Sequence, residues 1–128
     1  MFIYKEIFRF WRTLSVLIVI LTLCLIPSKD LSKIDLFKFN YVDLVVHLIM
    51  FIAFSSLLFR DLQRTIIFSH KPALIPIWVM LISLFLGITT EFLQYAWISL
   101  NRSASLSDLF FDFLGTSMGI TYKHFIRR

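Results

Sequence analysis

The chain has 128 residues, of which 59% are hydrophobic and 16% are charged, and its mean hydropathy is +0.83. Soluble domains carry about 25% charged residues, so this composition argues against an ordinary soluble domain and indicates an integral membrane protein. The formal net charge of +5 does not indicate a nucleic-acid partner, because the basic residues punctuate apolar segments instead of forming one stripe.

Four apolar segments predict an all-α membrane protein: a single integral membrane domain, residues 1–128, folded as a bundle of four transmembrane helices. The predicted helices cover residues 9–27, 42–60, 72–100 and 105–125. A spanning helix needs about 20 residues, and the second and third segments supply them. The first segment spans only if Arg12 snorkels to the interface. The fourth spans only if Asp108 and Asp112 face protein or water instead of lipid.

The first segment also resembles a signal peptide, because Lys5, Arg9 and Arg12 precede an apolar core. The residues at its end, Leu-Ile-Pro-Ser at positions 25–28, contain no small-x-small cleavage site. We therefore expect a retained helix. Cys24 is the single cysteine, so no intrachain disulfide can form, and a packed thiol is expected there.

The distribution of lysine and arginine predicts the orientation of the helices. Three basic residues lie near the N-terminus, three lie between the second and third segments, and three lie near the C-terminus. The opposite side has four, namely Lys29, Lys33, Lys38 and Arg102. Because basic residues favour the cytoplasmic side, both termini are predicted to be cytoplasmic. Tryptophan and tyrosine residues fall near both predicted interfaces, as in an aromatic belt.

In this topology the unusual polar residues converge on the extracytoplasmic ends of three helices. The expected polar cluster comprises Asp43, His47, Glu91, Gln94, Arg102, Asp108 and Asp112. Spacings of three or four residues place each pair on one helix face. Charged residues inside membrane segments are costly and mark functional sites. Gly115 and Gly119, one turn apart, predict close packing against a neighbouring helix.

The spacing of these residues resembles the pattern of the VanZ-like family of bacterial multi-pass membrane proteins. The matching elements are Asp43-x-x-x-His47, Glu91-x-x-Gln94, Arg102 with Ser103 and Ser105, and Asp108-x-x-x-Asp112-x-x-Gly115. The resemblance implies an envelope role in the bacterial cytoplasmic (inner) membrane, and the founding member is associated with resistance to the glycopeptide teicoplanin. The family pattern usually has lysine at the position of Leu44 and asparagine at that of Asp112, so this site is more acidic.

Three functional classes remain open at this point. The favoured one is a non-catalytic binding or accessory protein whose polar site, at the outer leaflet, takes a lipid-linked envelope precursor or an amphiphilic antibiotic. The second is a membrane-embedded enzyme, a metal-assisted hydrolase or transferase acting on a lipid-linked head group, although no nucleophile constellation is recognisable. The third is a proton-coupled carrier, for which four helices leave little room. The lipid bilayer is the expected partner, and a homo-oligomer is compatible with the sequence.

The polar residues also have structural interpretations. Two pairs resemble capping boxes, Asn40 with Asp43 and Ser105 with Asp108. Three ion pairs are alternatives, Glu91 with Arg102, Asp112 with His47, and Asp112 with Arg102. No metal ligand is assigned, and the cofactor is unknown. If the carboxylates point inward, protonation of Glu91 or Asp112, or binding of a divalent cation, is needed to offset their charge.

Overall fold

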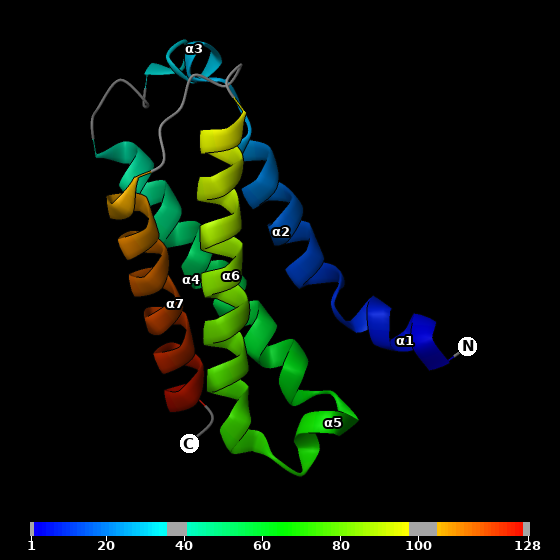
Figure 1. The fold of residues 1–128 in the computed structure, drawn as a ribbon. Coiled ribbons are helices and arrows are strands. Elements are labelled where there is room, and N and C mark those ends of the chain that lie inside the picture. The colour runs from blue at the N-terminus through cyan, green and yellow to red at the C-terminus, as the bar shows by residue number, and fades with distance from the viewer. Residues whose placement is uncertain (1, 36–40, 98–104, 127–128) are drawn as a thin grey trace.

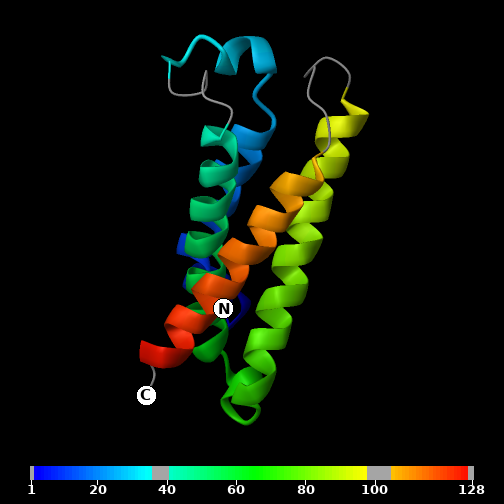
Figure 2. The same ribbon diagram turned by 90° about the vertical axis from the view of Figure 1, so that its left-hand side faces the viewer.

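The computed structural model describes residues 2–35, 41–97 and 105–126. These residues form helices and no strand, which confirms the all-helical prediction. The long helices, which run side by side (Figures 1 and 2), are α2 (Trp11–Cys24), α4 (Val42–Gln63), α6 (Ile75–Ala96) and α7 (Leu106–Ile126). The short elements are α1 (Phe2–Arg9), α3 (Ser28–Leu31), α5 (Ile66–Ser69) and the 3-10 helix η2 (Pro72–Leu74).

The first predicted helix, over residues 9–27, is shorter in the structure, where α2 begins at Trp11 and ends at Cys24. The chain bends at Phe10, whose φ of −87° and ψ of 5° lie outside the α-helical region, so the preceding helix α1 ends at Arg9. The 14 residues of α2 span about 21 Å, whereas the hydrocarbon core of a bilayer is about 30 Å thick. Pro27 accounts for the early end, since proline lacks an N–H group and disfavours helix at the preceding residue.

The other three long helices begin and end close to their predicted limits. Helix α4 continues three residues past the predicted end at residue 60, and α7 is displaced by one residue from the predicted 105–125. Pro72 opens the 3-10 turn η2, so α6 begins at Ile75. It ends at Ala96, and residues 98–104, which include the predicted end of this segment, lie outside the described residues.

Helices α2, α4 and α6 meet along an interface of hydrophobic side chains, which we call the apolar seam. Its buried residues are Ile20, Cys24, Met50, Phe51, Phe54, Leu58, Phe59, Leu62, Ile75, Val79 and Leu86. The rings of Phe51 and Phe54 pack edge to face with centroids 6.4 Å apart. Helix α4 is central, because it contacts α2, α6 and α7.

Helix α7 packs in a different way. The buried residues of its described part, which we call the polar seam where they meet α4 and α6, are Asp108, Asp112, Gly115, Thr116 and Gly119. A Cβ atom on Gly115 would lie 2.5 Å from the carbonyl oxygen of Leu48, and one on Gly119 would overlap the Oγ of Ser55. Glycine at both positions therefore lets the backbones of α7 and α4 approach closely.

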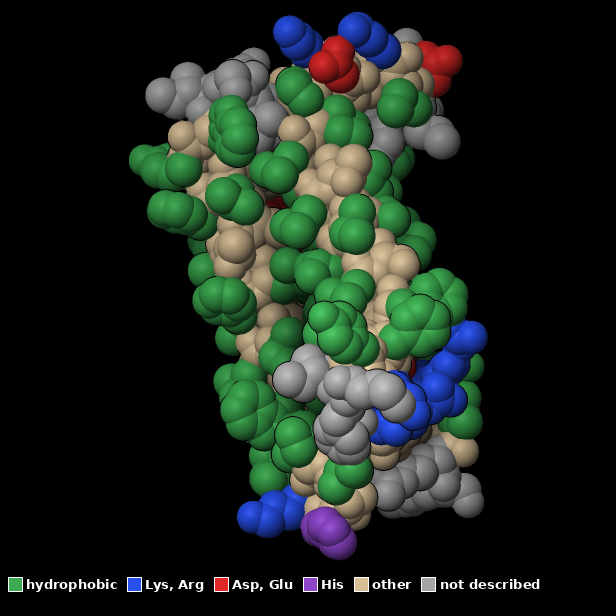
Figure 3. Space-filling view, turned by 90° about the vertical axis from the view of Figure 1, so that its right-hand side faces the viewer, with side chains coloured by type: hydrophobic (Ala, Val, Ile, Leu, Met, Phe, Trp, Pro, Cys, Tyr) green, Lys and Arg blue, Asp and Glu red, His purple; other side chains and the backbone are tan. Residues whose placement is uncertain are grey.

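Two helical stretches, Val42–Gln63 and Pro72–Ala96, are long and apolar enough to cross a membrane. In these stretches the outward-facing side chains are largely hydrophobic and exposed, including Ile49, Phe85 and Phe92. Figure 3 shows one face of the molecule, on which hydrophobic side chains cover the length of the bundle and lysine and arginine lie toward its two ends.

Candidate polar site at one end of the bundle

Six of the seven residues of the predicted polar cluster lie at the end of the bundle that carries α3. They are Asp43 and His47 on α4, Glu91 and Gln94 on α6, and Asp108 and Asp112 on α7. Helices α4 and α7 begin at this end and α6 finishes there, so the three pairs meet although they are far apart in sequence. Arg102 lies outside the described residues, and so do its predicted ion pairs.

The centre of the site is a buried hydrogen bond between α4 and α7. His47 Nδ1 lies 2.8 Å from Asp112 Oδ1, and the two side chains are 2% and 3% exposed. Because a carboxylate accepts hydrogen bonds, Nδ1 carries the proton and donates. Gly87 of α6 makes room for this carboxylate, since a Cβ atom there would lie 3.0 Å from Asp112 Oδ2. A buried pair of this kind fixes the rotation of α7 against α4.

Glu91 joins the end of α6 to the start of α7. The backbone N–H of Ser105 donates to Glu91 Oε2 at 2.6 Å, and Ser105 Oγ accepts from the backbone N–H of Asp108 at 3.4 Å. In a capping box the residue at the Asp108 position would receive the Ser105 N–H, but Glu91 receives it here. The negative charge of Glu91 complements the N-terminus of α7.

The second predicted capping box pairs Asn40 with Asp43 at the start of α4. The structure has Tyr41 at the N-cap position of this helix, and no side chain of the described residues makes a capping hydrogen bond there. Asn40 itself lies outside the described residues. Asp43 is therefore in the first turn of α4, where its charge complements the helix dipole, and it is only partly buried.

Gln94 links the site to α2. Its Nε2 donates to the carbonyl oxygen of Cys24 at 3.0 Å, and the side chain is 1% exposed. Its Oε1, together with Glu91 Oε1 and Asp112 Oδ2, is buried and has no hydrogen-bond donor within the described part of the chain. Most buried polar atoms in proteins are hydrogen-bonded, so three open acceptors at one end of an apolar bundle require an explanation.

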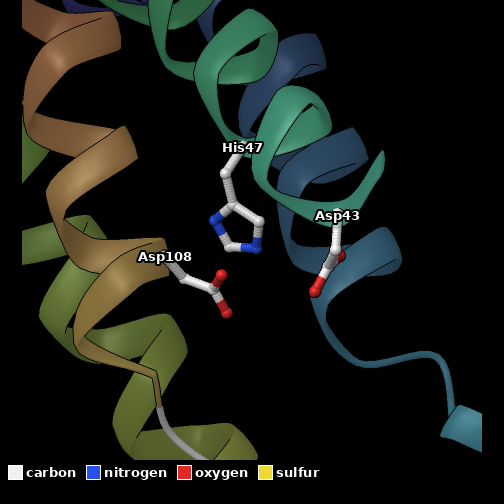
Figure 4. Close-up of side chains that lie close together, drawn as sticks. All are labelled: Asp43, His47 and Asp108. Atoms are coloured by element: carbon white, nitrogen blue, oxygen red, sulfur yellow. The ribbon is translucent and has the colours of Figure 1, made fainter. Parts of the chain in front are cut away.

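Asp43, His47 and Asp108 form a tighter group inside the site. One ligating atom of each residue lies within 4.8 Å of those of the other two, and Figure 4 shows the imidazole between the two carboxylates. A small pocket between α2, α3 and α4, walled in part by Leu31, Asp43 and His47, opens beside this group. These are the described side chains best placed to hold a cation.

A buried acid at the opposite end of the bundle escaped the sequence analysis. Thr13 Oγ1 donates to Asp61 Oδ2 at 2.6 Å, and Asp61 is 1% exposed. The sequence alone suggests a loop position, because Arg60 and Arg64 flank Asp61. The available signal is that Asp61 follows Asp43 by eighteen residues, or five turns of helix, and so shares its helix face.

Gly87 was likewise not singled out from the sequence. It stands in a strongly apolar run, where a lone glycine has no obvious polar partner, and only its separation of four residues from Glu91 marks it as lying on the inward face of α6.

No family model, no curated protein and no solved structure matches this chain. The resemblance to the VanZ-like family therefore depends on the residues and spacings quoted above.

Proposed function

We propose that the chain is a multi-pass integral protein of the bacterial cytoplasmic membrane, in which α2, α4, α6 and α7 all cross the bilayer. Helices α4 and α6 support this by length and composition, and only 39% and 33% of their apolar windows are buried. Such exposed apolar faces need a non-aqueous surrounding. For α7, the inward burial of Asp108 and Asp112 meets the condition for a charged helix in lipid. For α2, which is short, tilting of its neighbours and local thinning of the bilayer supply the difference.

We place α1 and the end of α7 on the cytoplasmic side. The support is the distribution of basic residues along the sequence, with three near the N-terminus, three between α4 and α6 and three near the C-terminus. The polar site then lies in the outer half of the membrane. This assignment puts it within reach of lipid head groups in the outer leaflet.

The function that this geometry supports best is binding of a polar head group at the outer leaflet. The observation that carries the proposal is a set of three buried acceptors that have no donor among the described residues, namely Glu91 Oε1, Gln94 Oε1 and Asp112 Oδ2. Acceptors need donors, so the matching head group is rich in hydroxyl, amine or amide groups. Lipid-linked wall precursors, with sugars and a peptide, and glycopeptide antibiotics of the teicoplanin type both carry such donors, and the VanZ-like pattern points the same way.

Binding is preferred to catalysis because of the partner of His47. Its Nδ1 is hydrogen-bonded to Asp112, and within the described residues no serine, threonine or cysteine is hydrogen-bonded to its ring. An activated nucleophile needs such a base within hydrogen-bond reach. The chain is thus proposed as an accessory or binding protein of the envelope.

The test uses the variant Glu91→Gln. Glutamine keeps an oxygen that accepts the Ser105 N–H, so the start of α7 is preserved while the charge is removed. The full-length protein in nanodiscs is titrated with a polyprenyl-diphosphate disaccharide pentapeptide and, separately, with teicoplanin. A hydrogen bond to a charged group contributes about 1.5–3 kcal/mol, so Glu91→Gln is expected to weaken binding by about tenfold or more.

The matched control is Asp61→Asn, which removes a buried acid at the other end of the bundle. It is expected to bind like the wild type. The proposal is contradicted if the wild type binds neither probe, or if folded Glu91→Gln protein binds with unchanged affinity.

A further inference from the structure

The group formed by Asp43, His47 and Asp108 has the composition of a cation site. Two carboxylates come from the first turns of α4 and α7 and one imidazole comes from the second turn of α4, and their ligating atoms lie within 4.8 Å of one another. In a tetrahedral site with bonds of about 2.1 Å, ligand atoms are about 3.4 Å apart, so closing these side chains onto one ion takes movements of roughly 1 Å. The helices need not move.

The orientation of His47 is a separate observation that points to a ligand. The side chain is 1% exposed, its Nδ1 donates to Asp112, and its other ring nitrogen, Nε2, is directed into the space between the carboxylates of Asp43 and Asp108 (Figure 4). With the proton on Nδ1, Nε2 presents a lone pair. A histidine that turns one ring nitrogen toward other ligands while a carboxylate holds the second nitrogen is the usual arrangement around a bound metal ion.

Asp43 is only partly buried, and together with His47 it borders the small pocket described above, so two of the three side chains of this group lie at the wall of that pocket.

We infer that Asp43, His47 and Asp108 bind one divalent transition-metal ion, with Zn²⁺ as the representative ion and Asp112 as the residue that positions His47. Imidazole nitrogen suits Zn²⁺, whereas Mg²⁺ prefers oxygen ligands and retains its waters. Three protein ligands leave a fourth position on Zn²⁺ open. That position is suited to a phosphate or hydroxyl oxygen of a head group.

The bound ion would give a phosphate-bearing head group a positively charged contact in an otherwise acidic site. Binding of a head group at the open position of the ion rests on the proposed function, but binding of the ion itself does not. Zn²⁺ binding is measured without lipid, so failure of the ion site and failure of head-group binding are distinct results.

The experiment titrates tag-free, chelator-treated full-length protein in detergent with Zn²⁺ alone, against a competing chromophoric chelator. A background with His70→Gln and His124→Gln removes the other two histidines. We expect one Zn²⁺ per chain, bound more tightly than Mg²⁺. Asp43→Asn and Asp108→Asn should each weaken binding at least about tenfold, Asp112→Asn should weaken it about 10–100-fold, and the control Asp61→Asn should leave it unchanged.

Absence of saturable Zn²⁺ binding by the wild type overturns the inference, and so does binding that survives Asp108→Asn. If a variant fails to fold, X-ray absorption on the Zn²⁺-loaded wild-type chain decides instead. One imidazole nitrogen with oxygen ligands supports the site, whereas two imidazoles or a sulfur ligand contradict it.

Discussion

The two seams that meet on α4 are held together by different chemistry. The apolar seam buries large hydrocarbon side chains such as Phe51, Phe59 and Val79, whereas the polar seam buries aspartates, a threonine and two glycines of α7. In a bilayer, hydrophobic side chains gain little by leaving lipid for protein, so apolar contacts alone do not select one helix partner over another. The hydrogen bonds and close backbone contacts of the polar seam do favour one helix partner over another, and the same residues form part of the polar site.

This difference separates packing from function. Residues of the apolar seam can be replaced by others of similar volume at small cost, because shape is all that they supply. The polar seam has less freedom, since Asp112 is hydrogen-bonded to His47 and the two glycines lie close to the backbone of α4. Substitutions in the polar seam should therefore lower the free energy of unfolding more than volume-conserving substitutions in the apolar seam.

The largest effect is expected for Asp112→Ala. It leaves the Nδ1 hydrogen of His47 buried without a partner, and removing one member of a buried pair costs about 3–5 kcal/mol. Denaturant unfolding of the protein in detergent measures the loss. Asp112→Asn retains an acceptor oxygen and is expected to lose less. A stability of Asp112→Ala within about 1 kcal/mol of the wild type would show that this hydrogen bond does not hold the polar seam.

Next in size is Gly115→Ala. The new methyl group would lie 2.5 Å from the carbonyl oxygen of Leu48 and 3.1 Å from the Cβ of Phe51, so α7 must move away from α4. Overpacking of this kind costs about 1–3 kcal/mol. Ser117→Ala is the control, because that hydroxyl bonds only to the carbonyl of Phe113 on its own helix. Equal stabilities of the two variants would contradict the close approach of α4 and α7.

A smaller loss is expected for Thr13→Val at the other end of the bundle. The valine has nearly the same shape but no hydroxyl, so Asp61 Oδ2 loses its donor while Oδ1 already lacks one. A net cost of about 1 kcal/mol follows, measured by thermal unfolding. Because Thr13 is far from the polar site, probe binding should be unchanged. Weaker head-group binding by this variant would mean that the two ends of α4 are coupled.

The smallest effect is expected for Asp30→Asn in α3. Lys33 donates to Asp30 Oδ1 at 2.7 Å and holds the pKa of that carboxyl below its usual range, but the pair is exposed. Solvent screens such pairs, and they contribute little to stability. The melting temperature should not change measurably. A clear decrease would indicate that α3 is fixed to the bundle through this ion pair.

Helical periodicity accounts for much of what the sequence reveals about this end of the bundle. Spacings of three and four residues put Asp43 with His47 and Glu91 with Gln94 on single faces, and the up-and-down order of the helices brings those faces to one end. The apolar composition predicts membrane helices, and the cost of charge in lipid predicts that their polar residues face the interior of the bundle.

The remaining features depend on tertiary contacts that no local pattern encodes. The hydrogen bond from Ser105 to Glu91 replaces a local capping box with a contact between helices, and the space for Asp112 is provided by Gly87 on another helix. The bend at Phe10 also has no local signal, because neither proline nor glycine is present there. Helix length was therefore overestimated at the N-terminal segment.

The central claim is that the polar site lies at the extracytoplasmic end of a membrane bundle. Cysteine labelling tests it most directly, in a background with Cys24→Ala and one new cysteine at exposed Ser32, after α3, or exposed Ser69, at the end of α5. Intact cells are treated with a membrane-impermeant maleimide, with permeabilised cells for comparison. The account predicts that the Ser32→Cys chain labels in intact cells and the Ser69→Cys chain labels only after permeabilisation. The reverse pattern would place the polar site in the cytoplasmic half of the membrane and contradict the account.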